Sequence, residues 1–243
     1  MIINSDSING SHIQNVEARY GPCYVLKSDI FIGQSIINYG EYSKEECEQL
    51  VSLANERRGL VIDVGANIGA ISQAFIATGH QVIAFEPQRE VFELLALNCP
   101  NGVLHNCALG AYNTIAKIPL LDYSLPNNYG EVTVGGSSGL DIVMKRLDDF
   151  CFEDVSLIKI DVEGYEEEVL RGAMDTVKRC KPILYLEADR EDKVSGLRNL
   201  LTKMGYSIQP HEPPLFAKKN YFNNENNIWG RQFFSFNWIC RKM

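Results

Sequence analysis

Residues 61–69 (VIDVGANIG), followed by residues 82–87 (VIAFEP), decide the fold. Each stretch is an apolar run with an acid at or near its end, Asp63 or Glu86, and the first continues through a glycine turn into a predicted helix. Open α/β sheets bind nucleoside cofactors outside the carboxyl ends of their parallel strands. The two stretches therefore predict two parallel strands with a nucleoside cofactor at their shared edge.

The glycine spacing distinguishes between cofactors. A dinucleotide-binding turn reads G-x-G-x-x-G, which lets the backbone approach a pyrophosphate. Counted from Gly65, that pattern requires glycines where this chain has Asn67 and Ala70. A cofactor with a ribose, a base and a compact cationic tail fits better, and S-adenosylmethionine (SAM) is such a cofactor. Glu86 is placed to accept hydrogen bonds from both ribose hydroxyls; the alternative is a plain strand-to-helix turn with solvated acids.

Composition bounds the class of protein. The 243 residues allow one large domain or two small ones, and 45% hydrophobic with 22% charged residues is ordinary for a soluble globular chain. A net charge of −8 makes a nucleic-acid partner unexpected, because backbone binding needs clustered Lys and Arg. The seven scattered cysteines contain no C-x-x-C pair, which predicts free thiols in a reducing compartment. With a polar amino terminus and no apolar run of about 18 residues, we expect a cytoplasmic protein without membrane contact.

Helices and strands alternate after residue 60. Strand patterns end at Gly or polar residues, and apolar residues at helical spacing separate most of them. The pattern predicts an α/β, Rossmann-like fold: a mostly parallel seven-stranded sheet with helices on both faces and one antiparallel strand. The predicted strands are residues 60–64, 81–85, 103–107, 157–160, 183–187, 206–209 and 233–241.

The chain before and between these strands is less regular. We expect residues 1–59 to form a strand/helix extension that packs on the core, and residues 60–243 to form the main domain. Residues 1–20 are predicted to be polar and loose, and residues 23–37 to form strands with a turn at Gly33. Ser43 and Glu46 have the spacing of a capping box, which starts a helix that ends near Arg58.

Two long stretches interrupt the alternation of helices and strands. Residues 111–150 are too long for a simple crossover and are predicted to be a strand-bearing insertion beside the site. Residues 211–231 are rich in Asn, Pro and aromatic residues. Long irregular loops in compact domains often bind ligands or cover them, which is the interpretation favoured here.

The fourth predicted strand delivers two acids to the sheet edge. Residues 157–166 (LIKIDVEGYE) place Asp161 and Glu163 between that strand and a helix. Such acids can orient a substrate, bind an ammonium group or accept a proton, and two neighbouring carboxylates raise one pKa toward that of a general base. The alternative is an acid pair that stabilises the start of a helix. Lys159 either points to solvent or pairs with an acid.

Other strand ends supply further candidates. Asn106 and Ala108 follow the third strand, where they are placed to flank a purine ring. Glu187 ends the fifth strand on the expected acceptor side and is a candidate for substrate contact. His211 ends the sixth strand and is a candidate base, although a lone loop histidine is more often polar surface.

The oxygen ligands that Mg²⁺ accepts are present in Asp161, Glu163 and Glu187, but nothing in the sequence requires a metal, and we expect none.

Several of these motifs together resemble the FkbM family of SAM-dependent methyltransferases. The likeness spans about residues 60–190, and the run KIDVEG at residues 159–164 is its most specific part. The resemblance implies a Rossmann-like methyltransferase fold, SAM as methyl donor, and O-methylation of a hydroxyl on a small molecule, sugar or natural product. The runs that carry the resemblance are residues 63–69, 84–87, 108–110, 159–166, 169–173 and 182–187.

Motif and resemblance together give a set of candidate residues. The catalytic candidates are Asp161, Glu163 and His211, and the substrate-binding candidates are Glu163 and Glu187. The cofactor-binding candidates are Asp63, Gly65, Ala66, Asn67, Gly69, Glu86, Pro87, Asn106, Ala108 and Asp161.

Two other functions stay open at this point. A non-catalytic SAM-binding interaction subunit would bind the cofactor without turnover. An NAD-linked oxidoreductase is disfavoured by the spacing at Asn67. The expected partner is a small-molecule or saccharide acceptor, and a homodimer is left open.

Overall fold

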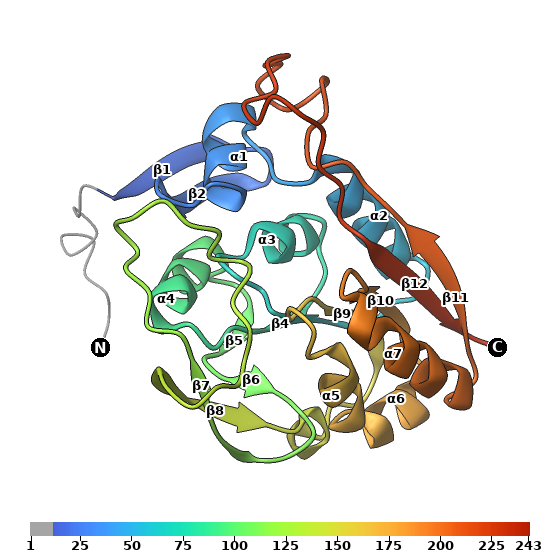
Figure 1. The fold of residues 1–243 in the computed structure, drawn as a ribbon. Coiled ribbons are helices and arrows are strands. Elements are labelled where there is room, and N and C mark those ends of the chain that lie inside the picture. The colour runs from blue at the N-terminus through green and yellow to red at the C-terminus, as the bar shows by residue number, and fades with distance from the viewer. Residues whose placement is uncertain (1–11) are drawn as a thin grey trace.

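A seven-stranded sheet forms the centre of the computed structural model, which describes residues 12–243 (Figure 1). The strand order is β11-β12-β10-β9-β3-β4-β5. β12 runs antiparallel to both of its neighbours, and the pairs β10–β9, β9–β3, β3–β4 and β4–β5 are parallel. The predicted mostly parallel sheet with one antiparallel strand is confirmed. Its strands are β3 (Leu60–Val64), β4 (Val82–Phe85), β5 (Val103–His105), β9 (Val155–Ile160), β10 (Ile183–Glu187), β11 (Tyr206–His211) and β12 (Asn237–Lys242).

Helices cover both faces of this sheet, because successive side chains of a strand point to opposite sides. Ile62 and Ile158 belong to one apolar cluster, which includes residues of α5, α6 and α7. Val61 and Leu157 belong to the other, with residues of α2, α3 and α4. The helices are α2 (Lys44–Asn55), α3 (Ala70–Ala77), α4 (Arg89–Asn98), α5 (Glu166–Arg171), α6 (Met174–Cys180) and α7 (Glu191–Lys203). Within residues 12–243, no helix has the length and apolar character that crossing a bilayer requires.

The amino-terminal region differs from its prediction. Residues 13–18 are not loose, because β1 (Ile13–Ala18) forms a hairpin with β2 (Gly21–Leu26). The expected strand after it is helix α1 (Ile32–Tyr39), whose first turn is fixed by the Asp29 carboxylate, which accepts from two backbone N–H groups. Gly33 lies inside that helix rather than in a turn. A Cβ there would meet the Leu26 carbonyl oxygen at 2.2 Å, so the packing of the helix on β2 requires glycine. Residues 1–11, the start of the expected extension, lie outside the described residues. The expected boundary at residue 60, between an extension that packs on the core and the main domain, stays a prediction.

Helix α2 begins where expected but without the predicted capping box. Ser43 is its N-cap, yet it has a left-handed backbone with φ of 40° and makes no side-chain capping bond. An N-cap side chain reaches the helix N–H groups from an extended backbone, which Ser43 does not have. The helix ends at Asn55, before Arg58.

The predicted insertion carries strands. A second sheet has the order β6-β8-β7, with β6 parallel and β7 antiparallel to β8. A buried loop residue, Tyr129, ties the connection to helix α4, because its carbonyl accepts from the Gln88 amide at 3.0 Å. The elements of this region are β6 (Ala108–Leu109), β7 (Thr114–Ile118), β8 (Leu140–Lys145) and the 3₁₀ helix η2 (Leu147–Phe150).

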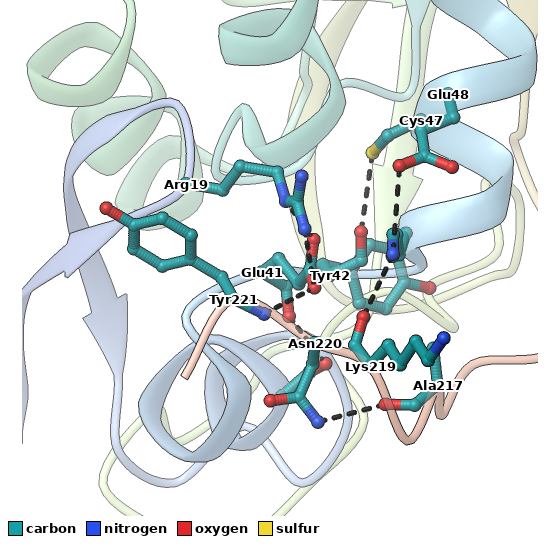
Figure 2. A network of polar contacts seen from close by, with 11 residues as sticks. Arg19, Glu41, Tyr42, Cys47, Glu48, Ala217, Lys219, Asn220 and Tyr221 are labelled. Atoms are coloured by element: carbon teal, nitrogen blue, oxygen red, sulfur yellow. Dashed lines mark hydrogen bonds and ion pairs between the residues drawn. The ribbon is translucent and has the colours of Figure 1, made fainter. Parts of the chain in front are cut away.

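The long loop between β11 and β12 is fastened to the amino-terminal region (Figure 2). The Glu41 carboxylate accepts from the Arg19 guanidinium and, at 2.7 Å, from the backbone N–H of Tyr221. Lys44 Nζ donates to the Lys219 carbonyl at 2.9 Å. This loop also contains the first residues of the predicted strand 233–241, which begins at Asn237 instead. The loop therefore has a fixed position over the edge of the sheet that the site occupies.

Candidate active site

A cavity of about 340 Å³ lies at the carboxyl ends of β3, β4, β9 and β10. This is the edge at which open α/β sheets bind ligands. The strand ends form its floor, and the insertion loop at residues 128–134 forms one wall. Residues 233–237 and the starts of α1 and α2 form the remaining walls. One site thus combines the strand ends with side chains that lie far from them in the sequence.

The turn after β3 requires glycine for reasons of space. Gly65 has φ of 75°, and a Cβ there would lie 1.9 Å from the Asp161 carbonyl oxygen. This close approach lets the ends of β3 and β9 meet at the cavity. Gly69 has φ of 88° and starts α3, but it packs against Cys99 and Leu95 of the α4 region and does not line the cavity.

Glu86 presents a buried carboxylate to the cavity. It is only 3% exposed, and it accepts from the backbone N–H of Asn67 at 3.0 Å and of Gln88 at 2.8 Å. Burial raises the pKa of Glu86 to about 7, and these hydrogen bonds oppose the shift. The Asn106 amide donates to the Glu86 and Pro87 carbonyls at 2.8 and 3.2 Å, so Asn106 braces this turn from outside the cavity.

A buried ion pair lies beneath the floor. Asp63 is fully buried, and its carboxylate accepts from Ser72 at 2.6 Å and lies 3.1 Å from Lys159 Nζ. The ammonium group also donates to the Gly65 carbonyl at 3.0 Å and lies 3.4 Å from the Asp161 carboxylate. Burial alone would lower the pKa of Lys159, but the surrounding carboxylates, Asp63 first, hold it above its usual value. Lys159 therefore pairs with acids and fixes the ends of β3 and β9.

Three carboxyl groups gather on the acceptor side of the floor. Burial and the nearby Asp161 raise the pKa of Glu163 to about 7, against the opposing effect of its hydrogen bond from Arg190. Burial and Asp161 also hold the pKa of Glu187 well above its usual range, so Glu187 is a neutral acid that can donate a hydrogen bond. Oxygens of Asp161, Glu163 and Glu187 lie within 4.8 Å of one another, a spacing that can hold a divalent cation. The expectation of no metal stays a prediction.

His211 is not brought to the cavity. It ends β11, which β12 separates from β10, and its Nδ1 lies 2.9 Å from the Tyr185 hydroxyl instead. The position of β12 is the physical reason, because the antiparallel strand takes the place beside β10 that a sixth parallel strand would have occupied.

The structure gathers most of the candidate residues. Those that line the cavity are Gly65, Asn67, Glu86, Pro87, Ala108, Asp161, Glu163 and Glu187, and those that do not are Asp63, Ala66, Gly69, Asn106 and His211. Ala66 is buried in the apolar cluster on the α3 side of the sheet.

Sequence reasoning missed the lining residues that come from outside the strand ends. The aromatic residues within 233–236 could have indicated a wall of the cavity. Glu46 was predicted only as part of a helix cap. Asn237 is 4% exposed, and among the described residues its Nδ2 has no hydrogen-bond partner, as is true of Glu187 Oε2. Missed lining residues include Phe31, Tyr42, Glu46, Gln88, Asn128, Tyr165, Phe233 and Asn237.

Comparison with known proteins identifies the family. The family model of the methyltransferase FkbM domain matches residues 63–208. Methyltransferase sdnD of Sordaria araneosa is 27% identical over 175 residues, 55% of this chain and 67% of that protein. The 2-O-methyltransferase NoeI of Sinorhizobium fredii is 24% identical over 169 residues, 59% of this chain and 69% of that protein.

A solved structure shares the fold. The methyltransferase FkbM of Methylobacillus flagellatus superposes with a TM-score of 0.51 at 18% identity. The match covers 75% of this chain but 43% of the longer one, so this chain spans less than half of that relative. Because the family match extends over more than half of the sequence, the chain belongs to the methyltransferase FkbM family.

Proposed function

We propose that this protein transfers a methyl group from SAM to a hydroxyl of a small molecule or saccharide. The observation that carries the proposal is the buried Glu86 carboxylate beside the Gly65 turn, facing a cavity at the carboxyl edge of the sheet. The volume of about 340 Å³ falls within the range of small-ligand pockets, about 300–1,000 Å³. The family and its named relatives support methyl transfer, and NoeI is by its name an O-methyltransferase.

The residues present fit the cofactor. Glu86 accepts from the ribose hydroxyls in its ionised form, and its hydrogen bonds to Asn67 and Gln88 hold its oxygens in place. Gly65, Pro87 and Ala108 also line the cavity. The turn at Gly65 would hold the amino-acid tail of the cofactor, and Pro87 and Ala108 would be the small or apolar neighbours of its purine ring. The cofactor, when bound, supplies an electrophilic methyl group.

The chain supplies orientation and a proton acceptor. Positioning contributes much of the rate of such a displacement, since reacting atoms must be close and in line. Asp161, held by Lys159, accepts a hydrogen bond from the acceptor hydroxyl and orients its oxygen. Glu163, with a pKa of about 7, takes the proton as general base. Glu187 and Asn237 have unpaired polar atoms and donate to further oxygens of a hydroxylated acceptor.

We also infer a cytoplasmic location. All seven cysteines lie within the described residues and are free, which supports a reducing compartment.

Calorimetric titration with SAM, S-adenosylhomocysteine and NAD tests the donor site. We expect saturable binding of the two sulfur nucleosides alone, weakened about 30-fold or more in Glu86→Ala, since hydrogen bonds to a charged group contribute about 1.5–3 kcal/mol each. Glu90→Ala is the matched control, because Glu90 is an exposed glutamate in the first turn of α4, and its loss should leave binding unchanged. Binding of NAD instead, or of none of the three, would reject the proposal. Cofactor binding without turnover across an acceptor screen would favour a non-catalytic subunit.

A further inference from the structure

The cavity is lined by carboxyl groups and by no cationic side chain. Among the described residues that surround it, none is Lys, Arg or His. Two cations contact its acids from outside this lining. Lys159 lies 3.4 Å from Asp161 but is also paired with Asp63, and Arg190 contacts Glu163. Each cation is thus shared between acids, and the space between them faces mainly negative charge.

Arg190, the cation on the acceptor side, is shared by three carboxyl groups. It donates a hydrogen bond to Glu163 and lies 3.5 Å from oxygens of both Glu131 and Asp189. Glu131 belongs to the insertion loop and Asp189 follows β10, so the two acids reach the cavity from different elements. One positive charge offsets at most one of the three negative charges. Glu131 and Asp189 therefore remain available to a cationic ligand.

The negative charge is strong enough to keep protons on neighbouring groups. Burial raises the pKa of Glu163, and the charges of Asp161 and Asp189 raise it further. Burial and the same two acids also raise the pKa of Glu187. SAM, with a sulfonium, an ammonium and a carboxylate, brings one net positive charge and does not balance these acids. An acceptor with a carboxylate or phosphate would be repelled here, and a cationic acceptor would be attracted.

An aromatic ring and an unpaired amide lie next to Asp189. Phe236 is 48% exposed and lines the cavity, and its carbonyl accepts from the N–H of Ala188, the residue before Asp189. The face of an aromatic ring attracts an ammonium group. Asn237 also lines the cavity and is 4% exposed, and no described residue pairs with its Nδ2. This wall therefore suits a ligand that carries both an ammonium group and an oxygen.

We propose that the acceptor is a hydroxylated amine whose ammonium group binds between Glu131 and Asp189, beside Phe236. The identity of the site rests on the proposed function, and the inference adds the charge of the substrate. A primary amine titrates near the pKa of lysine, about 10.4, so it is protonated at neutral pH. An ammonium nitrogen has no lone pair and does not attack the methyl group. The hydroxyl beside Asp161 and Glu163 therefore remains the methyl acceptor, and the amine serves recognition.

Calorimetric titration of the whole protein, saturated with S-adenosylhomocysteine, tests the charge with two matched series of probes. Tyramine, tyrosol and 4-hydroxyphenylacetate share a phenol and end in an ammonium, a hydroxyl and a carboxylate. Glucosamine, glucose and glucuronate make the same comparison on a sugar, so the test does not depend on one molecular shape. In at least one series we expect the amine to bind about tenfold more tightly than the neutral probe, and the carboxylate to bind most weakly.

Variants of the two proposed ammonium ligands locate the effect. Asp189→Asn and Glu131→Gln should each reduce the preference for the amine by about threefold and leave the affinity for the neutral probe unchanged. Asp192→Asn is the matched control, because it removes the same charge from a side chain that is 75% exposed in the first turn of α7, outside the cavity lining. It should keep the full preference.

Equal affinities within both series, tighter binding of the carboxylates, or no binding of either amine would overturn the inference. So would a preference that both Asp189→Asn and Glu131→Gln leave intact. If S-adenosylhomocysteine binds without a charge preference among the probes, the proposed function stands and this inference fails. If S-adenosylhomocysteine does not bind, the proposed function fails, and the same titrations of the protein alone still measure the charge preference.

Discussion

Glu86 makes cofactor binding dependent on pH at the scale of one residue. Its pKa is raised to about 7 by burial, and the ionised form is the one that accepts two hydrogen bonds from ribose hydroxyls. The affinity for S-adenosylhomocysteine should therefore fall as the pH drops below about 7, by up to about tenfold per pH unit. Calorimetry between about pH 5.5 and pH 8 measures this dependence. In Glu86→Gln the affinity should be lower and flat with pH, and a native protein with flat affinity would contradict the prediction.

The substitution Gly65→Ala tests how much a single added methyl group destabilises the turn after β3. Gly65→Ala combines a left-handed backbone with a Cβ 1.9 Å from the Asp161 carbonyl oxygen, and we expect a loss of unfolding free energy of about 3 kcal/mol or more. Gly79 is the matched control, since it has φ of 88° but nothing within 4 Å of the added Cβ. Gly79→Ala should cost only the strain of the left-handed backbone, about 1–2 kcal/mol. Urea unfolding compares the two, and equal losses would show that the contact with Asp161 has no energetic weight.

At the scale of elements, Glu41 holds the long loop before β12 to the amino-terminal region. Its side chain is 3% exposed and binds both Arg19 and the backbone of Tyr221 (Figure 2). Glu41→Gln should destabilise the protein by about 1–3 kcal/mol and speed backbone deuterium exchange in the loop, because an unpaired buried partner is costly.

Glu48→Gln is the control for this prediction. Glu48 is half exposed and lies 3.9 Å from Lys44, so its loss should change stability by less than about 0.5 kcal/mol. Exchange in the loop that is as slow in Glu41→Gln as in Glu48→Gln would show that other contacts hold the loop.

The elements that the sequence predicted correctly are those marked by a pattern of residues within the element itself. β3, β4, β9 and β10 are apolar runs with turns after them, and their burial on both faces makes the pattern unambiguous. The region of helix α1 was predicted as strand because residues 23–37 alternate between apolar and polar positions. The close approach of Gly33 to the Leu26 carbonyl, which leaves no room for a Cβ, joins two elements and gives no local signal.

The same distinction applies to the site. Gly65, Glu86 and Asp161 follow strands directly, so the rule that ligands bind at the carboxyl edge of the sheet was enough to find them. Glu46 and Asn237 reach the cavity only through the packing of α2 and the antiparallel placement of β12. His211 was misplaced for the same reason, since the strand order could not be obtained from the residues around it.

For the whole molecule, the cavity concentrates buried acids that cost stability when ionised. Burial raises the pKa of Glu46, Glu86 and Glu163 to about 7, and all three line the same space. Proteins retain such groups at functional sites more often than elsewhere. The folded state therefore binds more protons than the unfolded chain at mildly acidic pH, and this links global stability to the chemistry of the site.

Glu46→Gln measures that link for one residue. The folded pKa of about 7 is above the usual 4.5, so the stability from neutral Glu46 is fully present below about pH 4.5 and is lost as the pH rises through 7. Glutamine stays neutral at every pH. The free energy of unfolding of Glu46→Gln should therefore rise relative to that of the native protein between about pH 5 and pH 8, by up to about 3 kcal/mol. Urea unfolding at each pH gives the difference, with the exposed Glu45→Gln as a control that should show no trend. A pH-independent difference would mean that Glu46 is ionised in the folded protein throughout this range.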